Sequence, residues 1–151
     1  MAAGETIHAS AVLVEGRGVL LRGPSGSGKS SLALALLLAD RERNRLISDD
    51  RVALRVRDGR LLAAPPPALA GLIEVRGLGI RRQPHVSPIE IHLVVDLVPA
   101  ADCPRLPDPA EAIAEIEGVR IGRIRLPAGQ ADGWIRVVAA LAFPAAAADG
   151  E

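Results

Sequence analysis

A glycine-rich loop constrains this chain more than any other part of its sequence. The loop reads Gly23, Pro24, Ser25, Gly26, Ser27, Gly28, Lys29 and Ser30, and it matches the full phosphate-loop pattern G-x-x-x-x-G-K-[ST]. Its glycines let successive backbone N–H groups turn toward phosphate oxygens. Lys29 is expected to reach the β and γ phosphates, and the Ser30 hydroxyl to bind Mg²⁺. The loop therefore predicts binding of a nucleoside triphosphate, with Ser31 as the last of the contacting residues.

The residues on either side of the loop support this interpretation. A short apolar strand over 19–22 leads into it, and residues 30–40 follow as a run of strong helix formers. Leucines lie all round this expected helix, so most of it should be buried. The positive end of its dipole then points at the bound anion. Strand, loop and helix thus occur in the order that the motif requires.

Composition limits the other partners that the chain can have. Its 151 residues fit one domain, 1–151, which we expect to be ordered over about 5–143 with a flexible tail at 144–151. With 18 basic and 18 acidic side chains, one Trp, one Phe and no Tyr, it has neither the charge nor the aromatic surface to bind nucleic acid. No stretch approaches the roughly 18 apolar residues of a membrane span, and no signal peptide precedes it. We expect a cytoplasmic protein with no nucleic-acid or membrane partner.

Hydrophobic patterning predicts a mixed α/β fold with a strand-rich body. Strands are expected at 6–14, 19–22, 45–48, 73–75 and 89–98, and hairpins are expected about Asp58-Gly59 and Gly118. Residues 77–79 should form a flexible bend, and the proline-rich residues 99–109 should be irregular. A final helix is expected because Trp134, Val137, Val138 and Leu141 follow the spacing of one helical face.

Two adjacent aspartates, Asp49 and Asp50, follow the short apolar strand at 45–48. In phosphate-loop enzymes a carboxylate at a strand end either holds Mg²⁺ or takes the proton from the attacking hydroxyl. The same pair would also suit an ordinary turn, but beside a phosphate loop we interpret it as functional. His8, on a strand, and Glu74, in a strand of alternating charge, have no decisive pattern of their own and are more typical of structural or solvated positions.

The sequence lacks the marks of two large phosphate-loop classes. No Asn-Lys-x-Asp motif for guanine and no Leu-Ser-Gly-Gly-Gln motif of transporter ATPases occurs. What it has is His8, the phosphate loop, Ile-Ser-Asp-Asp-Arg-Val at 47–52 and Ile-Glu-Val-Arg-Gly-Leu-Gly-Ile at 73–80. In this order the segments resemble the catalytic domain of HPr kinase/phosphorylase over about residues 5–143. The last segment is the most specific, because a generic phosphate loop does not explain it.

This resemblance implies a fold, an activity and partners. The fold would be the phosphate-loop variant shared with phosphoenolpyruvate carboxykinases. The activity would be ATP- and Mg²⁺-dependent phosphorylation of a serine of the phosphocarrier protein HPr, with removal of that phosphate by phosphorolysis as a second reaction. The enzyme would thereby regulate the phosphotransferase system, and the family tends to form homo-oligomers, often hexamers. A kinase of another substrate and a non-catalytic nucleotide sensor are the alternatives.

The resemblance also implies roles for individual residues. Asp49 would be the general base, and in the reverse reaction it would return the proton. His8 would tune that proton, and Asp50 would support either His8 or the metal. Ser30 and Glu74, with Asp50 as the further candidate ligand, would hold Mg²⁺. The charge on the transferring phosphoryl group would be neutralised by Lys29, Arg76 and Arg105.

The chain departs from the longer family members at several positions. These have a separate N-terminal domain, which we do not expect here. Ser31 stands where the family often has an acidic residue, and Ala9 where it often has glycine. Gln130 and Asp132 lie where the long forms have a Gly-Arg-Asn run. HPr as substrate and the phosphorylase reaction follow less directly from the residues than nucleotide binding does.

Overall fold

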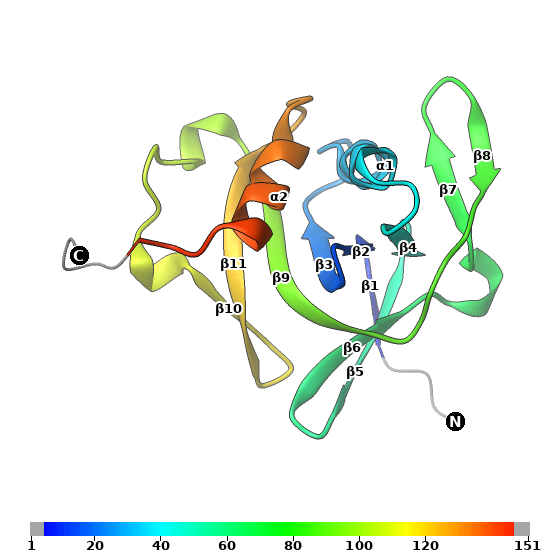
Figure 1. Cartoon of the computed structure of the whole chain (residues 1–151), viewed down its shortest axis with the longest axis horizontal. Coiled ribbons are helices and arrows are strands. Elements are labelled where there is room, and N and C mark those ends of the chain that lie inside the picture. The colour runs from blue at the N-terminus through cyan, green and yellow to red at the C-terminus, as the bar shows by residue number, and fades with distance from the viewer. Residues whose placement is uncertain (1–4, 147–151) are drawn as a thin grey trace.

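The computed structural model describes residues 5–146 as a strand-rich α/β fold with two helices (Figure 1). The helices are α1 (Lys29–Ala39) and α2 (Gly133–Ala142). The strands are β1 (Thr6–Ile7), β2 (Ala9–Val14), β3 (Arg17–Arg22), β4 (Arg45–Ser48), β5 (Val52–Arg57), β6 (Arg60–Ala64), β7 (Leu72–Val75), β8 (Gly79–Arg82), β9 (Ile89–Val98), β10 (Ile113–Ile116) and β11 (Val119–Pro127). Single 3-10 turns occur at Pro67–Leu69, Ala100–Asp102 and Pro109–Glu111.

One large sheet contains every strand except β7 and β8. Its order is β1-β5-β6-β9-β3-β2-β4, and β11 lies on β9 with β10 beyond it. The long strand β9 joins two parts of this sheet, because its start pairs with β6 and its remainder pairs in parallel with both β3 and β11. Figure 1 shows β9 curving through the centre of the molecule. The curl brings the end of β3, where the phosphate loop begins, next to the ends of β9 and β11.

Both faces of the sheet are covered by apolar side chains. Along β3, Val19 and Leu21 belong to one buried cluster and Leu20 to the other, as the two-residue period of a strand requires. The first cluster includes Leu36 of α1 and Val137 of α2, so the two helices cover the same face. Packing of α1 against the strands fixes its N-terminus, and with it the end of the phosphate loop.

A buried ion pair braces the strands where the phosphate loop starts. Arg22, the last residue of β3, donates two hydrogen bonds to the carboxylate of Asp96 on β9, at 2.8 and 2.9 Å. The Nε atom of Arg123 on β11 lies 2.7 Å from the same carboxylate. Bidentate pairs of this kind fix geometry as well as charge. Three strands are therefore held in register directly beneath the loop.

Strands β7 and β8 form a separate hairpin. β7 packs beside α1, whereas all four residues of β8 are exposed, and the hairpin extends away from the main sheet (Figure 1). Gly77 and Gly79 have φ values of +84° and +95°, which only glycine adopts readily. The sequence predicted β7 and a bend at 77–79 but not β8. Its Gly-Ile-Arg-Arg sequence lacks the apolar alternation that burial produces, so the usual signal is missing.

Most other expected elements are confirmed, with small differences at their ends. β4 and β9 have the predicted bounds, both hairpins turn at the predicted glycines, and the final helix is α2. His8 interrupts the strand expected at 6–14, and the helix expected at 30–40 starts one residue earlier. Residues 99–109 are irregular apart from 3-10 turns. Of the predicted tail, 144–146 have no helix or strand, and 147–151 lie outside the described residues. Within 5–146 no helix is long and apolar enough to span a bilayer.

Candidate functional site

The phosphate loop connects β3 to α1, as the motif predicts. Gly26 and Gly28 have φ values of +82° and +98°, so both need the freedom of glycine. At Gly23 the constraint is steric: a Cβ atom there would lie 2.6 Å from the Ser27 hydroxyl and 3.1 Å from Leu97. Gly23, Gly26 and Gly28 are thus each required by the geometry of the loop.

Lys29, the first residue of α1, is only 6% exposed. Its Nζ atom donates hydrogen bonds to the carbonyl oxygens of Gly23 and Pro24, at 2.6 and 3.0 Å. Burial lowers the pKa of Lys29 from its ordinary value of 10.5, and the nearby carboxylates of Asp50 and Asp49 partly offset that lowering. The ammonium group of Lys29 therefore lies over the phosphate loop, where we expect it to bind the phosphates of a nucleotide.

Asp49 comes directly after β4 and is 4% exposed. The Ser10 hydroxyl on β2 donates to its Oδ1 atom at 2.6 Å. The Ser30 hydroxyl on α1 lies 2.8 Å from Oδ1 and 3.0 Å from Oδ2, and the backbone N–H of Glu74 on β7 donates to Oδ2 at 3.2 Å. Three separate elements thus hold one carboxylate in a fixed orientation against the serine of the phosphate loop.

Asp50 has a different environment, although it is the next residue. Its side chain is 66% exposed, and its Oδ1 atom lies 3.1 Å from Nε2 of His8. Its backbone has a φ of +72°, in the left-handed region that aspartate tolerates better than most residues. The turn directs the two carboxylates apart, so that one is buried in a hydrogen-bonded network and the other faces solvent beside a histidine.

A cavity of about 220 Å³ at the mouth of the loop brings most of the predicted site residues together. Its lining includes His8, Ser25, Gly26, Gly28, Lys29, Ser30, Ser31, Asp50, Glu74 and Arg76. Asp49 contacts the lining residues Ser10 and Ser30, and Gly23 and Ser27 lie within the loop without lining the cavity. Residues from β2, α1, the β4–β5 turn and β7 therefore meet at one place, which we call the transfer cavity.

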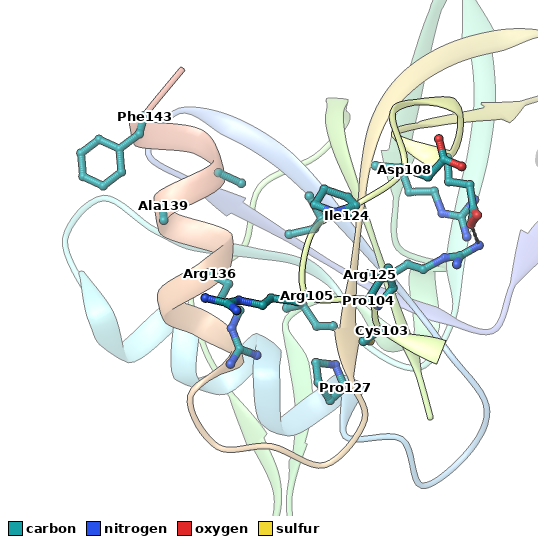
Figure 2. A pocket seen from close by; sticks show the side chains of 15 residues that line it. Cys103, Pro104, Arg105, Asp108, Ile124, Arg125, Pro127, Arg136, Ala139 and Phe143 are labelled. Carbon is teal, nitrogen blue, oxygen red and sulfur yellow. Dashed lines mark ion pairs between the residues drawn. The ribbon is translucent and has the colours of Figure 1, made fainter. Parts of the chain in front are cut away.

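Arg105 is the one predicted site residue that is not brought to this place. It lines a larger cavity of about 660 Å³ between α2, β11 and the 103–111 segment (Figure 2). Other arginines there are paired: Arg125 forms an ion pair with Glu111, and Arg136 lies 3.5 Å from Asp132. The role of Arg105 at the phosphoryl group stays a prediction that no contact of the described residues supports.

Ser10 belongs to the site but was missed in the sequence. It is fully buried, and the hydrogen bond that it donates to Asp49 spans 39 residues of sequence. No motif contains a serine at this position. A polar residue inside the otherwise apolar run 9–14, two residues after His8, is the only signal that points to it.

The oxygen ligands in the transfer cavity fit Mg²⁺. Among residues 5–146, no three His, Cys, Asp or Glu side chains form a metal cluster of their own. Mg²⁺ in phosphoryl-transfer sites uses one or two carboxylates together with substrate phosphates and water. The Ser30 hydroxyl and the carboxylates of Asp50 and Glu74 all line the cavity and supply that kind of incomplete set.

Comparisons with known proteins agree with this geometry. The family model of the HPr Serine kinase C-terminal domain matches residues 1–147. An HPr kinase/phosphorylase from Lactobacillus acidophilus is 37% identical over 138 residues, covering 84% of this chain and 42% of that protein. One from Clostridium botulinum is 45% identical over 74 residues, covering 49% of this chain and 23% of that protein. The chain thus matches less than half the length of these curated relatives.

A solved structure supports the same assignment. The Hpr(Ser) kinase/phosphatase from Coxiella burnetii has a TM-score of 0.72 to this chain at 28% sequence identity, covering 88% of this chain and 91% of the solved one. The strand-rich α/β architecture expected from the resemblance is therefore confirmed. On these grounds the chain belongs to the HPr serine kinase C-terminal domain family.

Proposed function

We propose that this chain is an ATP-dependent protein kinase that phosphorylates a serine of HPr. Family membership supports the activity, and one contact carries the assignment of the site. The buried carboxylate of Asp49 touches the phosphate-loop hydroxyl of Ser30, at 2.8 and 3.0 Å. A candidate base and the nucleotide loop are thereby joined before any substrate binds. We further propose that residues 5–143 act as one catalytic domain, in the cytoplasm and as a homo-oligomer.

The loop and α1 would hold the phosphates of ATP. The backbone N–H groups of the loop face the phosphates, and Lys29 supplies the positive charge at the β and γ positions. Mg²⁺, at Ser30 with Glu74 and Asp50, would neutralise further phosphate charge. Arg76 lines the same cavity and adds a second cationic side chain. Arg105 would complete this set only if its segment reaches the phosphoryl group.

Asp49 is the proposed general base. As the serine oxygen of HPr attacks the γ phosphorus, its proton passes to Asp49, an oxygen–phosphorus bond forms, and the bond to the β-phosphate oxygen breaks to leave ADP. Oδ1 accepts short hydrogen bonds from Ser10 and Ser30, at 2.6 and 2.8 Å, whereas the contacts of Oδ2 with Ser30 and with the N–H of Glu74 are longer, at 3.0 and 3.2 Å. Oδ2 is therefore the oxygen that we expect to accept the proton. Asp50 contacts His8 at 3.1 Å through Oδ1, so it would support His8 in addition to its proposed place at the metal.

The same groups would serve the reverse reaction with inorganic phosphate. Phosphate attacks the phosphorus of phosphoserine, the bond to the serine oxygen breaks, and protonated Asp49 donates its proton to that oxygen. The products are serine and pyrophosphate. One carboxyl group thus acts as base in one direction and as acid in the other.

The test is transfer of phosphate to HPr of the same organism with Mg-ATP, read by intact-mass spectrometry. We expect one added phosphate on a serine, and loss of transfer by a factor of about 100 or more in Lys29→Ala. Arg57→Ala, which removes an exposed cation from the β5–β6 hairpin, is the matched control and should react like the parent chain. ATP binding without transfer by the parent chain would instead favour a nucleotide sensor or a kinase of another protein.

A further inference from the structure

The cavity in which Arg105 lies is separate from the transfer cavity. Its volume is about 660 Å³, against about 220 Å³ for the transfer cavity, and the two share no lining residue. It lies between α2, β11 and the 103–111 segment (Figure 2). Small-molecule sites have volumes of roughly 300–1,000 Å³. The space is therefore large enough for a ligand of its own, and we call it the arginine cavity.

The walls of the arginine cavity on β11 and α2 are mostly apolar. They are formed by the side chains of Ile124, Leu126, Pro127, Ala139, Ala140 and Phe143. An apolar ligand body binds favourably to such walls, because contact removes the apolar surface of both from water. A sugar is disfavoured, since its hydroxyl groups would lose their hydrogen bonds to water against these walls.

The charge of the cavity is positive. Its described lining has four arginines and two acidic side chains, which are Arg105, Arg123, Arg125, Arg136, Asp108 and Glu111. Four positive charges against two negative charges leave a net charge of +2, although the whole chain has 18 basic and 18 acidic residues and no net charge. This local excess favours an anionic ligand.

Two of the four arginines are already paired with carboxylates. The Nε atom of Arg123 lies 2.7 Å from the carboxylate of Asp96, which is 7% exposed, and Arg125 forms an ion pair with Glu111. These pairs join the β11 side of the cavity to β9 and to the 103–111 segment. That side of the cavity is thus held in place by contacts that exist without a ligand.

The other two arginines are available to a ligand. Arg105 forms no hydrogen bond or ion pair with any residue in the described range 5–146. Arg136 lies 3.5 Å from Asp132 in an exposed i, i+4 pair, which contributes little. Figure 2 shows the Arg105 side chain pointing toward α2, the helix of Arg136. Two guanidinium groups directed into one cavity repel each other unless an anion lies with them.

Cys103, which also lines the cavity, responds to this charge. Burial raises the pKa of its thiol, and the nearby positive charges of Arg125 and Arg136 partly oppose that increase. The charges of both arginines therefore act inside the cavity. Because Cys103 is the only cysteine of the chain, its thiol is a single chemical reporter of whether the cavity is occupied.

We propose that the arginine cavity binds a small carboxylic acid with an apolar body. The carboxylate pairs with Arg105 and Arg136, because the guanidinium fork matches the two oxygens of a carboxylate. The apolar body lies against the walls of β11 and α2. Inorganic phosphate would also match the arginines, but it has no apolar body for the walls. Binding of the acid requires neither nucleotide nor HPr.

The test compares four probes that separate the charged head from the apolar body. Phenylbutyrate has both, phenylbutanol has the same body without the charge, and acetate and inorganic phosphate have a charge without the body. The Kd of phenylbutyrate, measured by isothermal titration calorimetry, should be at least about tenfold lower than the Kd of each other probe. Bound phenylbutyrate should also slow the alkylation of Cys103 by iodoacetamide, which locates the probe in the cavity.

Arginine variants test which side chains bind the carboxylate. Arg105→Gln and Arg136→Gln should each raise the Kd of phenylbutyrate by about tenfold and leave the Kd of phenylbutanol unchanged. Both side chains are exposed, so neither substitution threatens the fold. Arg43→Gln is the matched control and should leave both Kd values unchanged. Arg43 is likewise exposed and lies 3.9 Å from Asp40 in an i, i+3 pair, but it does not line the cavity.

Three results would overturn the proposal. The first is a Kd of phenylbutyrate that is no lower than that of phenylbutanol or of inorganic phosphate. The second is an equal loss of phenylbutyrate affinity in Arg136→Gln and Arg43→Gln, because the effect would then come from the overall charge of the chain. The third is phenylbutyrate binding that leaves the alkylation rate of Cys103 unchanged, which would place the probe outside the cavity.

Discussion

The floor and the rim of the transfer cavity differ in how the protein holds them. The floor consists of Ser10, Lys29, Ser30 and Asp49, which are buried or half-buried. Ser10 and Ser30 donate hydrogen bonds to Asp49, and Lys29 donates to carbonyl oxygens of the loop. The rim consists of His8, Asp50 and Arg76, which are exposed, and Arg76 lies in the turn of the β7–β8 hairpin. Asp49 and Asp50 are neighbours in sequence, yet one is 4% exposed and the side chain of the other is 66% exposed.

The difference in exposure indicates that the floor and the rim have separate tasks. The hydrogen-bond donors to Asp49 in the floor come from β2, α1 and β7, whose positions the fold fixes. The rim has few internal contacts, and Leu78 and Ile80 of the hairpin are 63% and 62% exposed. The proposed protein substrate would need such open surface beside the reacting groups. We therefore expect floor substitutions to change both stability and transfer, and rim substitutions to change transfer alone.

The largest effect is expected for Asp49→Asn. The amide cannot accept the serine proton, so transfer to HPr should fall by a factor of about 100–10,000. The amide N–H₂ group would also face a hydroxyl or the Glu74 N–H, so the free energy of unfolding should fall as well. Transfer is measured by intact mass, and stability by urea titration. Asp58→Asn, at the exposed β5–β6 turn, is the matched control. Full transfer by Asp49→Asn would remove it as the base.

A smaller effect on transfer is expected for the rim pair. Asp50→Asn removes the negative charge from the 3.1 Å contact with His8, and His8→Ala removes the contact itself; each should slow transfer by about tenfold. Because both side chains face solvent, the free energy of unfolding should stay within about 0.5 kcal/mol. The double variant tests their coupling: it should be no slower than the slower single variant. Independent, multiplying effects would show that the two residues act separately.

Sequence patterns predicted the elements in which burial produces a regular pattern of apolar residues. β9 was predicted at 89–98 because its long apolar run is enclosed by neighbours on both sides. β8 was missed because it is exposed along its whole length and its residues carry no trace of burial. The curl of the sheet could not be predicted from the sequence either. It depends on the pairing of β9, which pairs first with β6 and further along its length with β3 and β11.

For the site, local motifs and the resemblance were enough to name most lining residues of the transfer cavity. They could not reveal Ser10, because its contact with Asp49 is set by the pairing of β2 with β4 and not by any short pattern. They also could not show that Arg105 lies elsewhere, since its position depends on how residues 99–112 fold against α2 and β11. Long-range packing decides such positions.

Ser10→Ala tests the floor at the residue that sequence patterns missed. Loss of the hydrogen bond to a buried carboxylate should reduce the free energy of unfolding by about 1–3 kcal/mol. Because Asp49 is then less well oriented, kcat should fall by about tenfold while KM for ATP is unchanged. Ser48→Ala is the matched control, since Ser48 is equally buried but donates to the Arg51 carbonyl. An equal loss of kcat in both variants would reduce Ser10 to a structural role.

The smallest effect links floor and rim through the charge of Lys29. Burial lowers the pKa of Lys29, and Asp50 and Asp49 partly oppose this. The folded chain then loses this proton at a lower pH than the unfolded chain, whose lysine keeps its ordinary pKa of 10.5. Between the lowered pKa of the folded chain and the ordinary value, the unfolded chain binds more protons. The free energy of unfolding therefore rises with pH over this range. Urea titrations should therefore show that the unfolding free energy of the parent chain, relative to that of Lys29→Met, increases as the pH approaches 10.5.

Asp50→Asn should strengthen that pH dependence. It removes the larger of the two contributions that raise the pKa of Lys29, so the folded-state pKa falls further and the window widens toward lower pH. The comparison is the difference in unfolding free energy between Asp50→Asn and the double variant Asp50→Asn/Lys29→Met, followed over the same pH range. A difference that falls with pH would mean that the loop carbonyls and Asp49 outweigh burial. A pH dependence equal to that of the parent and Lys29→Met pair would mean instead that the rim has no electrostatic influence on Lys29.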